Sequence, residues 1–386
     1  MRIRYTAALA VVTVAIIGVA MSARRGDNTR LIRSLTLDQN PAAVAVDTRS
    51  GHAIVAVAPG LPGVSGHALI LDDKTGALLR TVDIGHAPRA LAVDERAGRV
   101  YLADDVAPAG QLGATAALYV LDERSGRVSR GIALDAPAVA MALDDQNGRL
   151  LTVSRGDIVN SAYGTGTVAV RDATTGTTLY TDTAGMYPTS IAIDARSQQI
   201  FIANLLDNSV SVLDARNGHT LRTITLAPPP GRGVAVALDA RARQVFALSL
   251  PPTIAGGPQL TLGSLATIDI ATGRLTRMIA LRNPAALAMD ERTGRVLVAT
   301  SGSVQVRDGA NGRLLRTITT GISPSALAVD GRSGRAILIR DDGAARDSDA
   351  WAWVPGWLRA KLPFVPRPSI HFHAIPASVS IFDLTR

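Results

Sequence analysis

The sequence predicts an all-β protein, a seven-bladed β-propeller of four-stranded antiparallel blades. Three observations predict it. A run of alternating apolar residues that ends in aspartate occurs seven times, a second run of similar kind follows each copy, and no helical pattern interrupts residues 28–340. Short strands repeated in units of about 40 to 50 residues are typical of propellers.

The first run is represented by "RALAVDERAGRVYLA" at 89–103. In every copy alanine stands two residues before the aspartate, and a large apolar residue stands one before it. Since successive strand residues point to opposite faces, each strand has a small face and a bulky face. We therefore expect this strand to be buried on both sides. The seven aspartates are Asp47, Asp94, Asp144, Asp194, Asp239, Asp290 and Asp330.

The second run is a strand, an aspartate, three residues, usually a glycine, and another strand, as in "SVSVLDARNGHTLRTITL" at 209–226. An aspartate that opens a turn accepts hydrogen bonds from the backbone beyond it, and glycine tolerates positive φ. We therefore interpret the aspartates of both runs as turn caps. Each copy then supplies strands A, B, C and D. The second set of aspartates is Asp72, Asp122, Asp172, Asp214, Asp269, Asp308 and Asp383.

The last copy lacks its fourth strand, because "SVSIFDLTR" ends three residues after Asp383. The segment "TRLIRSLTLDQNP" at 29–41 precedes the first copy and has the length of the missing strand. We predict that it pairs with the C-terminal strand and completes the last blade. This pairing would close the ring and remove an exposed edge.

The spacing of the aspartates separates two faces of the predicted disc. The interval from a second aspartate to the next first one is nearly constant, at 22, 22, 22, 25, 21 and 22 residues. The interval within a blade varies, at 25, 28, 28, 20, 30, 18 and 53 residues. The length variation therefore lies between strands B and C. We call the face with these connections the loop face, and the face with the A–B and C–D turns the hairpin face.

The crossovers between blades reach the loop face beside the central channel, mostly around a recurring proline. Their polar and aromatic residues are candidates for a ligand-binding channel mouth. The alternative is that they are ordinary rim residues. The candidates are Asn40, His86, Arg89, Tyr187, Arg232 and Asn283.

The B–C loop of the seventh blade is an outlying insertion over 340–377. It holds all three tryptophans, Trp351, Trp353 and Trp357. A loop this long is usually functional or disordered, and its aromatic residues argue against simple disorder. Three roles compete: a cap on the channel mouth, a binding loop whose exposed tryptophans are further candidate ligand-binding residues, and a membrane contact, which the predicted topology disfavours.

The insertion gives no clear metal signal. His371 and His373 lack an evident third ligand, and the acidic residues over 341–349 lack calcium-loop spacing. The sequence indicates no metal and no cofactor.

Composition excludes several classes. The chain has no cysteine, so disulfides, thiolate catalysis and lipoprotein acylation are excluded. Its formal net charge of +8 comes mainly from scattered arginines, without a basic run, so no nucleic-acid partner is indicated.

The N-terminal residues 1–27 form a segment separate from the propeller at 28–386. An uncharged run over 5–23 is long enough to span a bilayer. We expect an uncleaved anchor with the propeller on the exported side, periplasmic or at the cell surface. Cleavage after Ala20 would instead give a secreted protein.

Blade 4 resembles the YVTN β-propeller repeat. In that repeat strand B ends near an asparagine, a short turn follows, and strand C reads Val-Ser-Val-Ile-Asp before a turn glycine. In "IFIANLLDNSVSVLDARNGHTLRTITLAPPPGRGVAVALD" at 200–239, these features fall on Asn204, Asn208, Val210, Val212, Asp214 and Gly218. The resemblance extends more weakly over 29–386. It implies a surface or periplasmic protein with a binding or scaffold role, while related propellers include lactonase-like enzymes and quinoprotein subunits.

Two functions follow from these observations. The first is a non-catalytic, membrane-anchored propeller that binds a protein, peptide or glycan on its loop face. The second is a lactonase-like or other hydrolytic enzyme with its site at the channel mouth. Glutamate occurs only at Glu95, Glu123 and Glu291, all in repeat turns, and no nucleophile elbow or phosphate-binding loop is present. The sequence therefore favours binding and indicates no catalytic residue.

Overall fold

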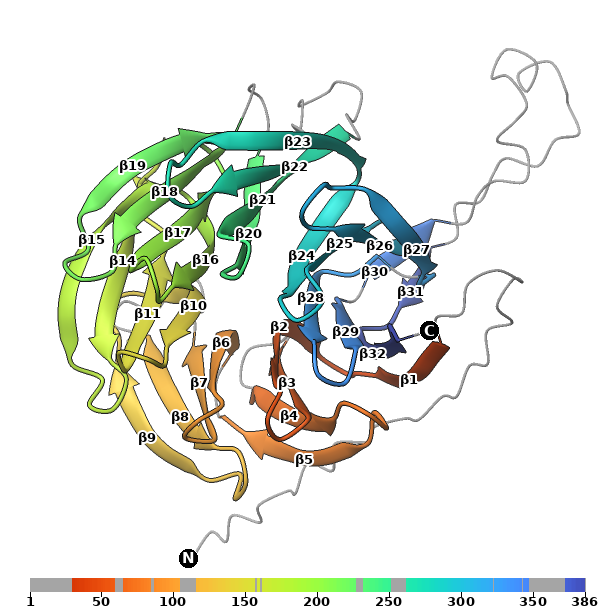
Figure 1. Ribbon diagram of the computed structural model, residues 1–386. Helices are drawn as coiled ribbons and strands as arrows, with labels where there is room; N and C mark the ends of the chain where they lie inside the picture. The colour runs from red at the N-terminus through yellow and green to blue at the C-terminus, as the bar shows by residue number, and fades with distance from the viewer. Residues whose placement is uncertain are drawn as a thin grey trace, which may run out of the picture.

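The chain forms seven four-stranded antiparallel sheets arranged around a central axis (Figure 1). The computed structural model describes residues 30–59, 65–84, 87–104, 116–156, 158–159, 162–226, 232–250, 262–321, 323–341, 343–346 and 372–385. The predicted seven-bladed propeller of four-stranded blades is thereby confirmed. Within these ranges no helix is long and apolar enough to cross a membrane, and the predicted anchor at 5–23 lies outside them.

Blades 1 to 4 follow one another in chain order, each with its strands in the order A, B, C, D from the axis outward. They comprise β2 (Asn40–Asp47), β3 (His52–Ala58), β4 (His67–Asp72) and β5 (Leu78–Asp83); β6 (Pro88–Asp94), β7 (Arg99–Asp104), β8 (Ala117–Asp122) and β9 (Val128–Ala133); β10 (Ala138–Asp144), β11 (Arg149–Ser154), β14 (Thr165–Asp172) and β15 (Thr178–Met186); and β16 (Pro188–Asp194), β17 (Gln199–Asn204), β18 (Ser209–Asp214) and β19 (Thr220–Thr225).

Blades 5 to 7 repeat the order, except that the outermost strand of blade 7 is the first strand of the chain. They comprise β20 (Arg232–Asp239), β21 (Gln244–Leu250), β22 (Leu262–Asp269) and β23 (Leu275–Arg282); β24 (Pro284–Asp290), β25 (Arg295–Thr300), β26 (Ser303–Asp308) and β27 (Leu314–Thr319); and β28 (Ala326–Asp330), β29 (Arg335–Arg340), β32 (Ser378–Asp383) and β1 (Arg30–Thr36). Two short hairpins lie in B–C loops: β12 (Ile158–Val159) with β13 (Ala162–Tyr163), and β30 (Gly343–Arg346) with β31 (Phe372–Ile375).

The repeated aspartates cap turns, as the sequence predicts. Each is the last residue of strand A or strand C, and a carboxylate oxygen of each accepts the backbone N–H two or three residues further on. In the turn after Asp72, for example, the Thr75 N–H donates to Oδ1 at 2.7 Å, and Gly76 has φ of 68°. These carboxylates are therefore occupied by backbone groups.

The burial pattern corrects one expectation. Strand A was expected to be buried on both faces, yet β2 is mostly half-buried, whereas the second strand, β3, is buried from Ala53 to Ala58. The reason is position: β2 lies next to the axis, where no further strand covers its edge. The continuous core is therefore centred on strands B and C, as in the cluster of Phe201, Val210 and Val245 between blades 4 and 5.

Neighbouring blades also meet at the C–D turns. A Cβ added to Gly126 of blade 2 would lie 2.4 Å from Cδ of Arg80, a residue on the outer strand of blade 1. A Cβ added to Gly76 of blade 1 would likewise lie 2.6 Å from Cβ of Arg33 on β1. Both glycines also have positive φ, 71° and 68°, so a larger residue there would be strained and would have to displace the arginine. β1 therefore makes with blade 1 the same kind of contact that β5 makes with blade 2.

The two ends of the chain lie in one sheet. β1 pairs antiparallel with β32, from Arg30 opposite Asp383 to Thr36 opposite Ser378. On the inner side of β32, Arg335 contacts Asp383 at 2.6 Å. Burial opposes the charge of Asp383, but hydrogen bonds from Thr385 and the ion pair with Arg335 lower its pKa to about 2.

Candidate functional site

A cavity of about 530 Å³ lies on the loop face, at the inner ends of blades 1, 2, 3 and 7. The connections that end there are the crossovers into β2, β6, β10 and β28, together with the ends of β3, β11 and β29. The cavity is lined by Asn40, Pro41, Ala42, Ala58, Arg89, Val139, Arg155, Ser325 and Asp341.

Arg89 is distinguished by its place in the repeat. It lies five residues before the first aspartate of its blade, and four residues of that position, from blades 1, 2, 3 and 7, line the cavity. The residues at this position in the seven blades are Ala42, Arg89, Val139, Thr189, Val234, Ala285 and Ser325. Arg89 is the charged one, and it is exposed, so it brings positive charge to a rim of small and apolar residues.

Two further charged residues, Arg155 and Asp341, line this cavity, which we call the mouth cavity. The guanidinium of Arg155 lies over the ring of Tyr187, 4.3 Å from its centroid, which holds a planar cation in place by a cation–π contact. On the other side, Ser325 Oγ donates to Asp341 Oδ1 at 2.9 Å. The cavity therefore presents two guanidinium groups and one carboxylate that already accepts a hydrogen bond.

The structure brings two of the predicted mouth residues, Asn40 and Arg89, together in this cavity, and Tyr187 supports it from beneath Arg155. Arg232 begins β20 of blade 5, whose strands do not line it. His86, Trp351, Trp353 and Trp357 lie outside the described residues.

Tyr187 and Asn283 each form a tight turn between two blades. Each is the single residue between an outer strand and the next inner strand, and their φ angles are 56° and 43°. Asparagine tolerates this left-handed conformation well, while a bulky residue such as tyrosine is uncommon there. Asn283 is exposed and does not line the mouth cavity, so its position is explained by the turn.

Arg155, Ser325 and Asp341 line the mouth cavity but were not predicted from the sequence, and Arg155 is the cation among them. It follows β11 at the start of a B–C loop and belongs to no repeated phrase. The sequence marks Arg155 only weakly, as a charged residue directly after a buried strand on the loop face. Only the arrangement of blades 2 and 3 places it in the same cavity as Arg89.

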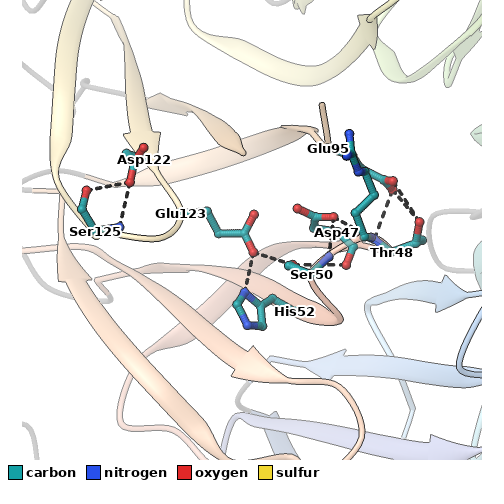
Figure 2. A network of polar contacts seen from close by, with 9 residues as sticks. Asp47, Thr48, Ser50, His52, Glu95, Asp122, Glu123 and Ser125 are labelled. Atoms are coloured by element: carbon teal, nitrogen blue, oxygen red, sulfur yellow. Dashed lines mark hydrogen bonds and ion pairs between the residues drawn. The ribbon is translucent and has the colours of Figure 1, made fainter. Parts of the chain in front are cut away.

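A second polar cluster lies on the hairpin face, between blades 1 and 2 (Figure 2). Glu123, whose side chain is 2% exposed, accepts hydrogen bonds at Oε1 from Ser50 Oγ at 2.7 Å and interacts with His52 Nδ1 at 2.5 Å. Nearby, the Oγ1 of Thr48 donates to Glu95 at 2.9 Å. In this way turns of blade 1 are bonded to turns of blade 2 (Figure 2).

The geometry of this cluster is that of an inter-blade contact. A hydrolytic triad needs the hydroxyl to bond the imidazole, which is in turn oriented by the acid. Here Ser50 and His52 both contact the same oxygen of Glu123, so the serine is not presented to a base. The cluster therefore joins blades rather than assembling a nucleophile.

Glu123 belongs to a position that is acidic in only two blades. The residue after the second aspartate is Asp73, Glu123, Ala173, Ala215, Ile270, Gly309 and Leu384 in blades 1 to 7. Burial, followed by the neighbouring Asp330 of blade 7, raises the pKa of Asp73 to about 6. Burial, followed by Asp47 of blade 1, likewise raises the pKa of Glu123. Blade 1 thus meets both its neighbours through buried carboxyl pairs.

Within the described ranges, no group of three or more histidine, aspartate or glutamate side chains is arranged to hold a metal ion. The mouth cavity has one carboxylate, Asp341, and no histidine among its lining residues. The groups that line it suit recognition: arginine binds carboxylates in a bidentate fork, and an amide such as that of Asn40 or a carboxylate such as that of Asp341 pairs with hydroxyls.

Comparison with known proteins gives a structural likeness. No family model matches the chain, and no curated protein matches it. Among solved structures, the chain is similar to hydrazine synthase of Kuenenia stuttgartiensis, with a TM-score of 0.62 and 12% sequence identity over 82% of this chain and 96% of that one. At this identity the likeness shows the fold alone, a seven-bladed β-propeller.

Proposed function

We propose that the protein is a non-catalytic binding protein of YVTN type, anchored to the membrane on the exported side, whose loop face binds a protein, peptide or glycan. The observation that carries this proposal is the mouth cavity, where Arg89 and Arg155 flank the opening. Two guanidinium groups favour a ligand with a carboxylate, such as an acidic glycan or a peptide with a free C-terminus.

The enzyme alternative receives less support. A hydrolase requires a base and a nucleophile or a metal within reach of one cavity. The described lining of the mouth offers only Asp341, which already accepts a hydrogen bond from Ser325. On the hairpin face, Ser50 and His52 converge on Glu123 without bonding each other.

Binding is tested with an array of uronic-acid oligosaccharides and peptides with free or amidated C-termini, followed by calorimetric titration of the hits. We expect Arg89→Gln and Arg155→Gln each to weaken binding about 10-fold or more, since a hydrogen bond to a charged group contributes about 1.5–3 kcal/mol. The matched control is Arg196→Gln, an exposed arginine on the hairpin face. Equal affinity for all variants, or for acid and amide ligands, contradicts the proposal.

Anchoring and export are tested separately. The full chain should fractionate with membranes and remain accessible to protease added to intact cells or spheroplasts. A propeller that is protected from protease in spheroplasts and degraded after lysis would instead lie in the cytoplasm.

We also propose that the pairing of β1 with β32 holds the ring closed. Support comes from the register over Arg30–Thr36, from the packing of Arg33 at Gly76, and from contacts between β28 and β2. Without β1, the outer edge of β32 would be open to water and to other chains.

A further inference from the structure

Exposed aliphatic side chains form a belt around the rim of the hairpin face. Of the eleven large hydrophobic residues that are exposed in the described ranges, seven lie in the first two residues of an outer strand, directly after a C–D turn. Blades 1 to 6 each contribute at least one. The belt consists of Leu79, Val128, Leu179, Leu221, Leu275, Leu314 and Leu315.

The belt is not explained by packing within the chain. Leu79, Leu179 and Leu221 are 50%, 52% and 48% exposed, although the same strands bury other aliphatic residues, such as Val82 of β5. In two of these strands the opposite end is polar, since β19 (Thr220–Thr225) and β27 (Leu314–Thr319) each end in an exposed threonine. Exposed large hydrophobic residues of the described loop face, such as Met186, Leu206 and Leu262, do not share one position of the repeat. The rim of the hairpin face, in contrast, is apolar at the start of the outer strand in six blades, and such a recurring apolar rim marks an interaction surface.

Arginines accompany the belt. In six of the seven blades the residue two after the first aspartate is an exposed arginine of the A–B turn: Arg49, Arg96, Arg196, Arg241, Arg292 and Arg332. Long arginine stems extend over apolar surface while their guanidinium groups remain among polar groups. The capping aspartates of the same turns balance the positive charge of these arginines. Binding to this face therefore does not depend on a net positive or negative charge.

The course of the chain indicates what covers this face. β1 begins at Arg30, opposite Asp383, which is the hairpin-face end of β32. Only residues 24–29 separate it from the uncharged run at 5–23. Six residues span at most about 20 Å, so an anchor at 5–23 holds the hairpin face close to the bilayer.

We propose that the hairpin face lies flat on the lipid bilayer, with the aliphatic belt in the headgroup region and the loop face directed away from the membrane. This inference rests on the proposed anchoring. A flat orientation brings the residues of all six blades to the surface together, whereas an edge-on orientation would use only one or two. Insertion of surface elements reaches about 5–10 Å into the headgroup boundary.

The absence of cysteine from the chain permits a direct test. Single cysteines at Leu221 and Leu315 of the full chain are labelled with an environment-sensitive fluorophore, and the protein is placed in phosphatidylcholine nanodiscs that contain headgroup spin-labelled lipid. Thr225→Cys and Thr319→Cys are matched controls, since both are exposed on the same strands. Four residues at about 3.3 Å separate each pair by about 13 Å.

We expect the spin-labelled lipid to quench L221C and L315C at least about twofold more than T225C and T319C, with little dependence on salt. Stronger quenching of the threonine-site labels overturns the orientation. No quenching at any site, in protein that co-purifies with the nanodiscs, overturns docking of this face while anchoring stands. Protein that does not incorporate at all overturns the anchor and this inference with it. Unchanged circular dichroism melting verifies that the variants are folded.

Discussion

Replacing Asp73 by asparagine should stabilise the protein at pH 8 and not at pH 4. Asp73 is fully buried at the interface of blades 1 and 7, where Ser333 Oγ donates to its Oδ2 at 2.5 Å. Its Oδ1 lacks a hydrogen-bond donor and the carboxyl group lies against Asp330. A proton held by Asp73 and donated to Asp330 satisfies both groups. Burial works against the charge of Asp330, but hydrogen bonds from Asp73 and Ser333 lower its pKa.

The magnitude follows from the pKa of Asp73. Burial and then Asp330 raise it from 3.8 to about 6. Between these values the folded state holds a proton that the unfolded state has released, so stability falls as pH rises from about 4 to about 6 and is then constant. About two units at 1.36 kcal/mol each give about 3 kcal/mol. Screening near the exposed Lys74 reduces this to about 1–2 kcal/mol.

The assay is urea unfolding of the full chain at pH 4 and pH 8. Asparagine retains an acceptor for Ser333 and donates its amide N–H to Asp330, so D73N should gain about 1–2 kcal/mol over the unsubstituted protein at pH 8 and nothing at pH 4. The exposed Asp38→Asn is the control. If D73N shows the same stability difference from the unsubstituted protein at both pH values, the shared proton does not exist.

Three further predictions concern the contacts between blades. Glu123→Gln should raise the melting temperature at pH 8 relative to pH 4, because burial and Asp47 raise the pKa of Glu123; an equal shift at both pH values would contradict this. Tyr101→Phe should cost about 1–2 kcal/mol in urea unfolding, because the buried hydroxyl donates to the Ala173 carbonyl at 2.9 Å; no loss would argue against this bond. Deleting residues 378–386 should abolish cooperative melting, since four buried apolar side chains of that segment contribute about 6–12 kcal/mol, comparable with the whole stability of a domain; unchanged melting would refute ring closure by β1 and β32.

Much of the fold follows from the sequence because its causes are local. An aspartate that ends a strand and caps a turn, as at Asp47, needs only its neighbours in the chain. Fourteen such aspartates mark the ends of strands A and C, and their spacing distinguishes the hairpin face from the loop face. The pairing of the N-terminal strand with the last blade also follows, because the two partial repeats add up to one.

The site depends on contacts between blades, which no repeat unit specifies. Arg89 is recognisable as the charged member of a repeated position, but Arg155 joins it only because blades 2 and 3 pack side by side. Glu123 and Asp73 look like ordinary turn residues in the sequence. Their carboxyl groups become partners of Asp47 and Asp330 only when a turn of one blade lies against the next.

The sequence by itself determined the number of blades, the order of strands, the turn chemistry and the face that carries variable loops, because each depends on residues near one another in the chain. The tertiary structure alone decided which inner strands remain partly open to water, which side chains from different blades share the mouth cavity, and where buried carboxyl groups meet. Burial, cavity shape and shared protons arise from residues tens or hundreds of positions apart, and only the packed ring fixes their distances.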